Sequence, residues 1–569
     1  MSTTYSSFNT RRTHQNEAIP GEAQMANNAG GFVYQLDPWK ALDRFLLIGS
    51  EGGTYYVEEE PLTKENALRT MACLAEDGIR VVDRIYEISA KGHAPKNDSA
   101  IFALALAASV KMGDAKGRSA ADLRSYALAH LPRVCRIPTH LFQFNSYVEN
   151  MRGRGRSLNR AIRAWYQDTP VDDLAYHMVK YQQREGWSHR DLLRLVRPNA
   201  RWAADSEQRN ALYRWAVKGA ETLTNDDVLV SQKLPHIISA FEAAKQNDGN
   251  LVHLIKNYNL SREMVPTEAL TRPEVWDALL DKMPITATIR NLGNMSKCGL
   301  LTPMSIAARL VCDRITDPHL LKKGRVHPIQ ILIAMKTYAS GKGFRGNGEW
   351  TVVPQIVDAL NDAFYLAFEQ LEPTGKRLLL GVDVSGSMAT ATINNTNITA
   401  RDAAAALALA CVKTEMEYYI MGFTAGPAYR GKTVLWSDYS KMQKSASLRM
   451  AGFVPLDITP KMRLDDVIKR TSELPLGPTD CALPMLWATQ NKVAVDAFIV
   501  LTDNETWAGE VHPSQALRQY REQSGINAKQ IVIGMTVTDF TIADPLDALS
   551  LDICGFDTAT PSVIEEFVR

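Results

Sequence analysis

The hydrophobic pattern changes once along this chain of 569 residues, near residue 371, and the change divides it into two kinds of structure. Before that point, apolar residues recur with the 3.6-residue period of helices, in segments of helix length joined by short connectors. After it, apolar runs of strand length alternate with helices, which is typical of a mostly parallel sheet covered on both faces. The sequence therefore predicts an all-α region followed by an α/β domain.

Residues 36–370 predict an array of helical repeats. Asn97 or Asp98 can begin a helix that is apolar on most of its faces, and we therefore expect this helix to be buried. Pro273 suits the first position of another helix, in which the apolar side chains share one stripe. The sequence has no strict repeat period, so the prediction of repeats depends on the type of element alone.

Residues 371–569 predict strands and helices in alternation. The expected strands are residues 376–384, 417–423, 433–436, 496–503 and 530–537. The expected helices are residues 399–414, 464–474, 481–490, 514–523 and 561–569. Ligands of such sheets bind at the carboxyl ends of the strands, so the residues at these ends are the first candidates for a site.

The N-terminal segment, residues 1–35, is rich in Ser, Thr, Asn, Gln and Gly and predicts a flexible polar tail. The tail lacks the apolar segment of a secretory signal, and the apolar run at 100–110 is shorter than the roughly 20 residues that span a bilayer. The seven cysteines are scattered, with no CxxC pair, which favours reduced thiols. We therefore expect a cytoplasmic protein with no membrane partner.

Charge is distributed unevenly along the chain. The net charge is +1, but residues 371–569 carry 18 Lys and Arg against 23 Asp and Glu. Residues 152–201 carry 11 Lys and Arg against five Asp and Glu. A local basic surface of this kind points to an anionic partner.

The ends of the expected strands carry oxygen ligands. Asp383, Ser385 and Ser387 follow the first strand in a DxSxS spacing, Thr479 precedes a helix, and Asp503 ends a later strand. Two carboxylates and three hydroxyls, without imidazole or thiolate, suit a hard divalent cation, and we expect Mg²⁺. Such a site would leave the cation incompletely neutralised, so an acidic group of a partner could complete it.

Two other interpretations of these residues are available. The serines could cap the following helix while Asp383 holds the loop. A phosphohydrolase with an aspartyl nucleophile would need a second acid two residues on, where this chain has Ser385.

The arrangement resembles the metal-ion-dependent adhesion site of von Willebrand factor A domains, and the order of elements matches that fold.

The basic stretch predicts a helix that could bind phosphate. Ser188 and Asp191 have the spacing of a capping box, and the helix that follows has a basic face opposite an apolar one. The candidate RNA-binding residues are Lys180, Arg184, Ser188, His189, Arg190, Arg194, Arg197, Arg156, Arg160, Arg136 and His140. A solvated face is the alternative for these charges.

Aromatic residues are interleaved with the basic residues of this stretch, and they could either stack on bases or belong to the core. They are Trp165, Tyr166, Tyr181, Trp187 and Trp202.

Segments spread from about residue 36 to the C-terminus resemble the Ro (SS-A/Ro) autoantigen family, in particular its bacterial members. They include VCRIPTHLF, REGWSHRDLLRL, VWDALLDKMPITATIRNLG, RVHPIQILIAMKTYASGKGFRG, KRLLLGVDVSGSM, GPTDCALPM and FIVLTDNETWAG. The resemblance implies a TROVE module, which is a ring of HEAT-like repeats with a basic central hole. It also implies a Rossmann-like von Willebrand A domain that helps to close the ring.

The resemblance further implies a function in noncoding RNA quality control. Family members bind small Y RNAs on the outer surface, where the counterparts of His189 and Arg190 make contacts, and bind the single-stranded 3′ ends of misfolded RNAs in the hole. Bacterial members are associated with polynucleotide phosphorylase through a Y-like RNA. We therefore expect a ribonucleoprotein scaffold, monomeric apart from RNA, and not an enzyme.

A protein-binding function is the alternative. Helical domains joined to a von Willebrand A domain also serve as cochaperones of hexameric ATPases, in which the metal site binds a carboxylate of the partner. A cochaperone has no need of the basic stretch at 152–201, so RNA binding distinguishes the two hypotheses.

Overall fold

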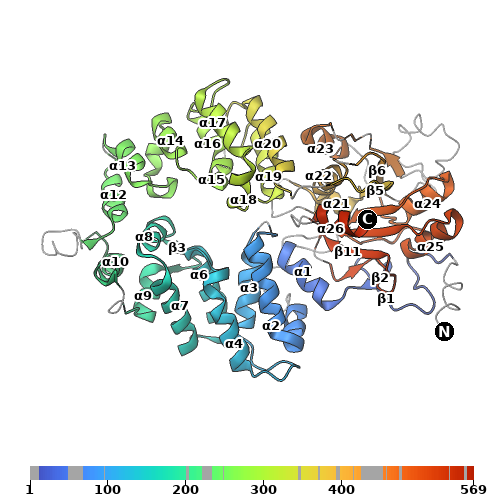
Figure 1. Cartoon of the computed structure of the whole chain (residues 1–569), viewed down its shortest axis with the longest axis horizontal. Coiled ribbons are helices and arrows are strands. Elements are labelled where there is room, and N and C mark those ends of the chain that lie inside the picture. The colour runs from blue at the N-terminus through green and yellow to red at the C-terminus, as the bar shows by residue number, and fades with distance from the viewer. Residues whose placement is uncertain are drawn as a thin grey trace.

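We describe a computed structural model of the chain. The structure describes residues 12–48, 68–94, 96–199, 204–220, 233–247, 249–343, 348–368, 372–391, 398–413, 415–424, 453–456, 458–459, 461–472, 477–536, 538–555 and 560–569. The expected strand at 433–436 and Trp202 lie outside these residues. A helical region and an α/β domain follow one another, as the hydrophobic pattern predicts (Figure 1).

The helical region forms two arms that together follow a closed path (Figure 1). The first arm contains α1 (Pro38–Ile48), α2 (Leu68–Lys91), α3 (Asp98–Ala107), α4 (Ala120–Ala129), α5 (Leu131–Val134), α6 (Pro138–Arg152), α7 (Arg156–Asp168), α8 (Val171–Lys180), α9 (His189–Val196) and α10 (Ser206–Lys218). The second arm contains α12 (His236–Ala244), α13 (Leu251–Tyr258), α14 (Pro273–Leu280), α15 (Ile285–Arg290), α16 (Leu292–Lys297), α17 (Ile306–Ile315), α18 (Pro318–Lys323), α19 (Pro328–Ala339) and α20 (Pro354–Leu366).

Local sequence explains where these helices begin and which faces they bury. Pro273 is the first residue of α14. At this position the lack of a backbone N–H costs no hydrogen bond, because the N–H of a first helical residue has no partner within the helix. In α3, every residue from Ser99 to Ala107 is buried, because this helix is apolar all round. Both observations confirm the expectations from the sequence.

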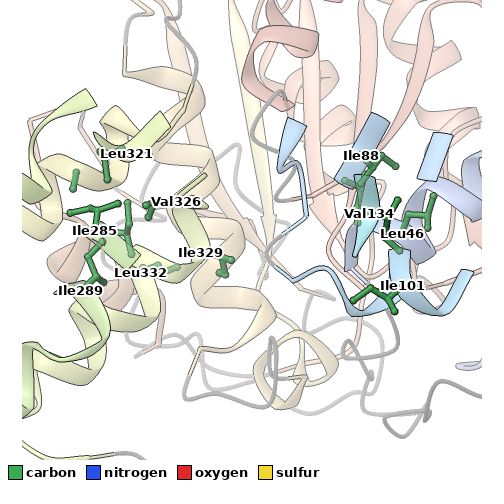
Figure 2. Packing of buried hydrophobic residues seen from close by; sticks show 14 of the residues in the cluster. Leu46, Ile88, Ile101, Val134, Ile285, Ile289, Leu321, Val326, Ile329 and Leu332 are labelled. Atoms are coloured by element: carbon green, nitrogen blue, oxygen red, sulfur yellow. The ribbon is translucent and has the colours of Figure 1, made fainter. Parts of the chain in front are cut away.

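The arms meet each other and the α/β domain at one side of the ring, which we call the arm junction. The Nε2 atom of His327, just before α19, lies 3.0 Å from the carbonyl oxygen of His93, just after α2. Figure 2 shows apolar side chains of the two arms on either side of this junction. The arms therefore close on each other as well as on the α/β domain.

Ion pairs join both helical arms to the α/β domain, among them Arg463 with Asp358 of α20. Arg44 of α1 donates to Asp552 at 2.7 Å, and both side chains are buried. Lys336 of α19 pairs with Asp402 at 2.7 Å. Each arm is thus attached to the domain that completes the ring.

The α/β domain is built on a six-stranded sheet of order β11-β9-β8-β5-β6-β7. Its strands are β5 (Leu378–Asp383), β6 (Tyr418–Phe423), β7 (Phe453–Pro455), β8 (Ala497–Thr502), β9 (Lys529–Gly534) and β11 (Ser550–Cys554). Its helices are α21 (Gly386–Thr390), α22 (Ala400–Val412), α23 (Leu464–Ser472), α24 (Leu483–Asn491), α25 (Pro513–Ser524) and α26 (Thr560–Val568).

All neighbouring strands of this sheet are parallel except the edge pair β6–β7. Strands β7 and β11 were not expected from the sequence. Because β5 lies between β6 and β8, the ends of β5 and β8 are adjacent at one edge of the sheet. This adjacency positions the candidate metal centre.

The described part of the N-terminal segment, residues 12–35, is ordered, and this differs from the expected flexible tail. It contains β1 (Gln24–Ala26) and β2 (Phe32–Gln35), and β2 pairs with β10 (Phe540–Thr541). We call residues 12–35 the N-terminal strap. Its buried side chains include Gln15 and Asn27, which form hydrogen bonds to loops of the α/β domain. Polar contacts and the buried side chains of Ile19, Val33 and Tyr34 together order this segment.

No helix in the ranges that the structure describes is both long enough and apolar enough to cross a membrane. Among the side chains that the structure describes, Cys73, Cys135, Cys298, Cys312, Cys411 and Cys481 are free thiols.

Candidate nucleic-acid interface and metal centre

The capping box at the start of α9 forms as the sequence predicts. The backbone N–H of Asp191 donates to the Ser188 hydroxyl at 3.4 Å, and the backbone N–H of Ser188 donates to the Asp191 carboxylate at 3.0 Å. Strands β3 (Gln183–Arg184) and β4 (Trp187–Ser188) form a short hairpin just before the helix. The hairpin and the cap together fix the N-terminus of α9.

His189, which was predicted to contact RNA, lies in the core of the first arm. Only 4% of its surface is exposed. Its Nδ1 lies 2.9 Å from the Tyr166 hydroxyl, and its Nε2 lies 3.0 Å from the carbonyl oxygen of Tyr181. Burial lowers the pKa of His189 to about 3, so the ring is neutral. Both ring nitrogens have partners inside the protein, and these contacts hold the start of α9 against α7 and the end of α8.

Exposed arginines lie on the helix that begins with His189 and on the neighbouring α7. We call five exposed side chains of α7, α9 and the α9 C-cap the α7–α9 basic face: Arg156, Arg160, Arg190, Arg194 and Arg197. The two helices are in contact, and the Arg163 Nε donates to the carbonyl oxygen of Val196 at 2.8 Å. Arg197 ends α9 in a left-handed conformation with φ of 46°. The arginine guanidinium groups could therefore reach phosphates from the surface of the first arm.

The other basic candidates near α9 have partners within the protein. The Lys180 ammonium lies 5.3 Å from the ring centroids of both Tyr176 and Tyr181. Arg184 is exposed and pairs with its neighbour Glu185 at 3.2 Å. A surface ion pair of this kind contributes little to stability, so Arg184 can exchange its partner for an anion.

Arg136 and His140 lie apart from the α7–α9 basic face, near the start of α6 at the arm junction. The Arg136 Nη1 donates to the Ser89 hydroxyl at 2.9 Å and to the carbonyl oxygen of Arg133 at 3.2 Å. Burial and the charge of Arg136 lower the pKa of His140 to about 4. The candidate RNA-binding residues therefore lie at two separate places on the first arm, one around α9 and one at the arm junction.

The aromatic residues of the basic stretch differ in how deeply they are buried. Trp165 and Tyr166 are buried, whereas Trp187 is half-buried beside the guanidinium of Arg154. Arg154 itself donates to Asn145 and Asn159, which places it inside the arm. Trp187 and Tyr181 are thus the half-buried aromatics of the described part of this stretch.

The carboxyl ends of β5 and β8 bring four of the five metal candidates together. The backbone N–H of Ser385 donates to Asp383 Oδ1 at 2.9 Å, and the Ser385 and Ser387 hydroxyl oxygens lie 3.1 Å apart. Burial raises the pKa of Asp503, and a hydrogen bond from the Ser387 hydroxyl opposes this rise, so these two side chains are also neighbours. All four side chains are buried.

Thr479, the fifth metal candidate, lies in a neighbouring loop. The backbone N–H of Gly386 donates to the carbonyl oxygen of Gly477 at 3.3 Å, which joins the DxSxS turn to this loop. Thr479 is itself buried, and its carbonyl oxygen accepts from the N–H of Ala508 at 3.0 Å.

Sequence reasoning missed three groups around this centre. Thr502 donates its hydroxyl to Asp383 Oδ2 at 2.7 Å. Burial raises the pKa of Glu505, two residues after Asp503, to about 7. Gln15 of the N-terminal strap donates to Asp480 at 2.7 Å and accepts from Thr506 at 2.5 Å. The acidic residues at 503–505 could have indicated Glu505 from the sequence, but no local sequence pattern indicates a role for Gln15.

The electrostatics of the centre fit a divalent cation. Burial and the charge of Asp503 raise the pKa of Asp383 to about 7. Within the described residues, Asp503 Oδ2 is buried and has no hydrogen-bond partner. A cation between Asp383 and Asp503 would offset the repulsion between these two buried carboxylates. It would also give the unpaired oxygen of Asp503 a partner.

The ligand set would depend on hydroxyls. No group of three or more His, Cys, Asp and Glu capable of holding a metal occurs in the described ranges. A cation at this centre would therefore be held by two carboxylates, serine and threonine hydroxyls, and water, which is the oxygen chemistry that Mg²⁺ accepts.

Comparisons with known proteins match this architecture. The family model described as TROVE domain matches residues 25–260 and 254–337, and the one described as Ro60 vWA domain matches residues 377–568. The chain belongs to the Ro60 family.

Two curated relatives are both called RNA-binding protein RO60. That of Deinococcus radiodurans is 37% identical over 96% of each chain, and that of Caenorhabditis elegans is 36% identical over 96% of this chain and 90% of its own. The crystal structure of the D. radiodurans Ro (RSR) protein is similar, with a TM-score of 0.66 and 36% identity, over 94% of this chain and 99% of that one.

Proposed function

We propose that this chain is an RNA-binding ring protein that acts in noncoding RNA quality control. The observation that carries the proposal is the α7–α9 basic face, which presents five exposed arginines beside the capped N-terminus of α9. Phosphates bind such surfaces through charge and through the free amides of a helix start. Relatives that match nearly the whole chain are named RNA-binding proteins, which agrees with this chemistry.

The proposed RNA ligands are of two kinds. A small Y-like RNA binds the outer surface at the α7–α9 basic face, which can grip duplex and loop phosphates. Misfolded RNAs enter the ring by their single-stranded 3′ ends, because a closed ring of helices admits a single strand more readily than a duplex. The closed path of the two arms supports this division (Figure 1).

The proposed function is binding and not catalysis. The ring holds RNA for degradation or maturation by a nuclease such as polynucleotide phosphorylase, joined through the Y-like RNA, and the complex contains one copy of this chain. The relatives are named for RNA binding, which favours a scaffold over an enzyme.

The α/β domain is proposed to hold Mg²⁺ at Asp383, Ser385, Ser387, Thr479 and Asp503. When bound, the cation supplies a Lewis-acidic position that an acidic group of a partner can occupy. The two carboxylates hold the cation, and the hydroxyls orient toward it from the DxSxS turn and the Thr479 loop. The orphaned oxygen of Asp503 supports the assignment.

The proposal is tested by titrating the full-length protein into a labelled hairpin RNA and following fluorescence anisotropy. The variant Arg190→Ala with Arg194→Ala is expected to weaken binding at least about tenfold, because two phosphate contacts are lost. Lys461→Ala with Lys469→Ala on the α/β domain makes the same change in net charge and is expected to bind as the wild type does. Equal affinity for all three proteins would contradict the proposed interface.

A further inference from the structure

The N-terminal strap contacts two loops that carry candidate metal ligands. We call residues 477–482 the Thr479 loop and residues 503–512 the Asp503 loop. These loops touch each other, because the backbone N–H groups of Trp507 and Ala508 donate to the Thr479 carbonyl oxygen at 3.2 and 3.0 Å. Strands β1 and β2 fix the strap to the α/β domain through β10 (Figure 1). The strap is therefore a third segment that meets at this centre.

Gln15 is a strap side chain that bonds to both loops. Its Nε2 donates to Asp480 of the Thr479 loop at 2.7 Å and to the carbonyl oxygen of Val511, in the Asp503 loop, at 2.8 Å. Its Oε1 accepts from the Thr506 hydroxyl at 2.5 Å. One buried amide thus joins the two loops, and its partner Asp480 is the chain neighbour of the candidate ligand Thr479.

The strap lies too close to the Asp503 loop for larger residues at two positions. A Cβ on Gly509 would lie 2.4 Å from the Gln15 Nε2 and 2.5 Å from Asp480 Oδ1. A Cβ on Gly31 of the strap would lie 1.8 Å from the carbonyl oxygen of Thr506. Glycine at both positions lets the two backbones approach, and the Gln15 N–H donates to the Gly509 carbonyl oxygen at 3.0 Å.

Asn27 holds the backbone of the Asp503 loop just after the candidate ligand. Its Nδ2 donates to the carbonyl oxygens of Thr506 at 2.8 Å and of Asn504 at 3.3 Å. Its Oδ1 accepts from the N–H groups of Ala29 and Gly31 at 3.1 and 2.8 Å. The same buried side chain therefore shapes the turn between β1 and β2 and attaches that turn to the loop.

Glu505 connects the strap to the candidate ligand Asp503. Its carboxylate accepts from the Asn28 amide at 2.8 Å and from the Ala29 N–H at 3.1 Å. Its own backbone N–H donates to Asp503 Oδ1 at 3.0 Å. The other oxygen, Asp503 Oδ2, is the buried one that has no hydrogen-bond partner among the described residues. By holding Glu505, the strap helps to fix which oxygen of Asp503 stays available to a cation.

We propose that the N-terminal strap is part of the metal centre, with Gln15, Asn27 and Asn28 as positioning residues that hold the Thr479 loop and the Asp503 loop in place for a divalent cation. The inference rests on the metal centre proposed above. The three residues act through their contacts with the loops and not as ligands. Loss of groups that orient metal ligands in this way weakens metal binding by about 10- to 100-fold.

The test measures Mg²⁺ binding to the full-length protein by isothermal titration calorimetry. Gln15→Met and Asn27→Leu keep the approximate size of each side chain and remove its hydrogen bonds. Each variant is expected to bind Mg²⁺ about tenfold more weakly than the wild type, because the strap no longer orients the loops. Both variants are expected to bind hairpin RNA as the wild type does, since the α7–α9 basic face is unchanged.

Tyr34→Phe is the matched control within the strap. The Tyr34 hydroxyl bonds to Glu22 and to Ser514 of α25, so this variant loosens the strap without removing a contact to either loop. It is expected to keep wild-type Mg²⁺ affinity, even where its melting temperature in a chelator falls as far as that of Gln15→Met. Asn28→Ala, at an exposed position, tests the same inference should the buried variants not fold, and it is expected to weaken Mg²⁺ binding.

Weaker Mg²⁺ binding in the Gln15, Asn27 and Asn28 variants, with wild-type affinity in Tyr34→Phe, would support the inference. Wild-type affinity in the first three variants would overturn it and leave the metal centre itself standing. An equal loss in Tyr34→Phe would also overturn it, because general loosening of the strap would then explain the effect. A wild-type protein that binds no Mg²⁺ would refute the proposed metal centre and this inference with it.

Discussion

At the scale of the residue, His189 and Arg190 show which structural features a sequence pattern predicts and which it does not. Their cap and helix are local features, and the spacing of Ser188 and Asp191 predicted them correctly. The burial of His189 depends on Tyr166 and Tyr181, which are 23 and eight residues away along the chain. A pattern shows that a histidine stands at a helix start, but only the packing shows which way its ring points.

The buried neutral ring of His189 predicts a pH dependence of stability. The pKa of His189 is lowered from 6.5 to about 3 by burial, so between these values the unfolded chain binds a proton that the folded chain does not. The contribution to stability is complete above pH 6.5 and is lost as the pH falls toward 3, by about 1.4 kcal/mol for each pH unit.

The variant His189→Gln, which cannot titrate, isolates this contribution. Urea unfolding between pH 7 and pH 5 is expected to show that the wild type loses more of its free energy of unfolding than the variant does. His140 remains in both proteins and serves as an internal control. Equal losses would mean that His189 is exposed to water in solution.

At the scale of the element, the sheet explains why the candidate metal centre could be predicted. Asp383 and Asp503 each follow a buried apolar strand, and adjacent parallel strands end at the same edge. The N-terminal strap could not be predicted in the same way. Gln15 finds its partner Asp480 at a separation of 465 residues, and its burial depends on hydrogen bonds and not on apolar area.

The DxSxS turn predicts divalent-ion binding that is separable from RNA binding. Ser385→Ala with Ser387→Ala is expected to abolish the rise in melting temperature that Mg²⁺ gives the wild type, because two hydroxyl ligands are lost. Hairpin RNA binding is expected to stay largely intact in this variant. Thr390→Ala, which removes a hydroxyl bonded to carbonyl oxygens within α21, should leave the effect of Mg²⁺ unchanged. Loss of both activities in the serine variant would show that the metal domain shapes the ring.

The N-terminal strap predicts a stability effect at a position that looks unimportant in the sequence. Gln15→Ala removes the hydrogen bonds that Gln15 makes with the buried groups of Asp480, Thr506 and Val511. We expect the free energy of unfolding to fall by about 2 kcal/mol. Asn16→Ala, at the exposed neighbour, is the control, and chemical unfolding measures both. Equal stability of the two variants would show that the strap is not held in solution.

At the scale of the whole molecule, closure of the ring depends on contacts between distant parts of the chain. Arg44 and Asp552 are 508 residues apart in the sequence, and His93 and His327 are 234 apart. The hydrophobic periods predicted the helices and the change to an α/β domain, but no periodic signal specifies how the arms meet. The resemblance to the Ro family supplied the ring.

The salt dependence of RNA binding tests the central claim most directly. We expect wild-type affinity for a tailed hairpin RNA to fall linearly with salt on a log–log scale, with a slope of about 0.7–0.9 per phosphate neutralised. Arg190→Ala with Arg194→Ala should lower that slope by about two, one for each phosphate contact. A protein that binds no RNA at low salt, or a variant whose slope equals that of the wild type, would contradict the account.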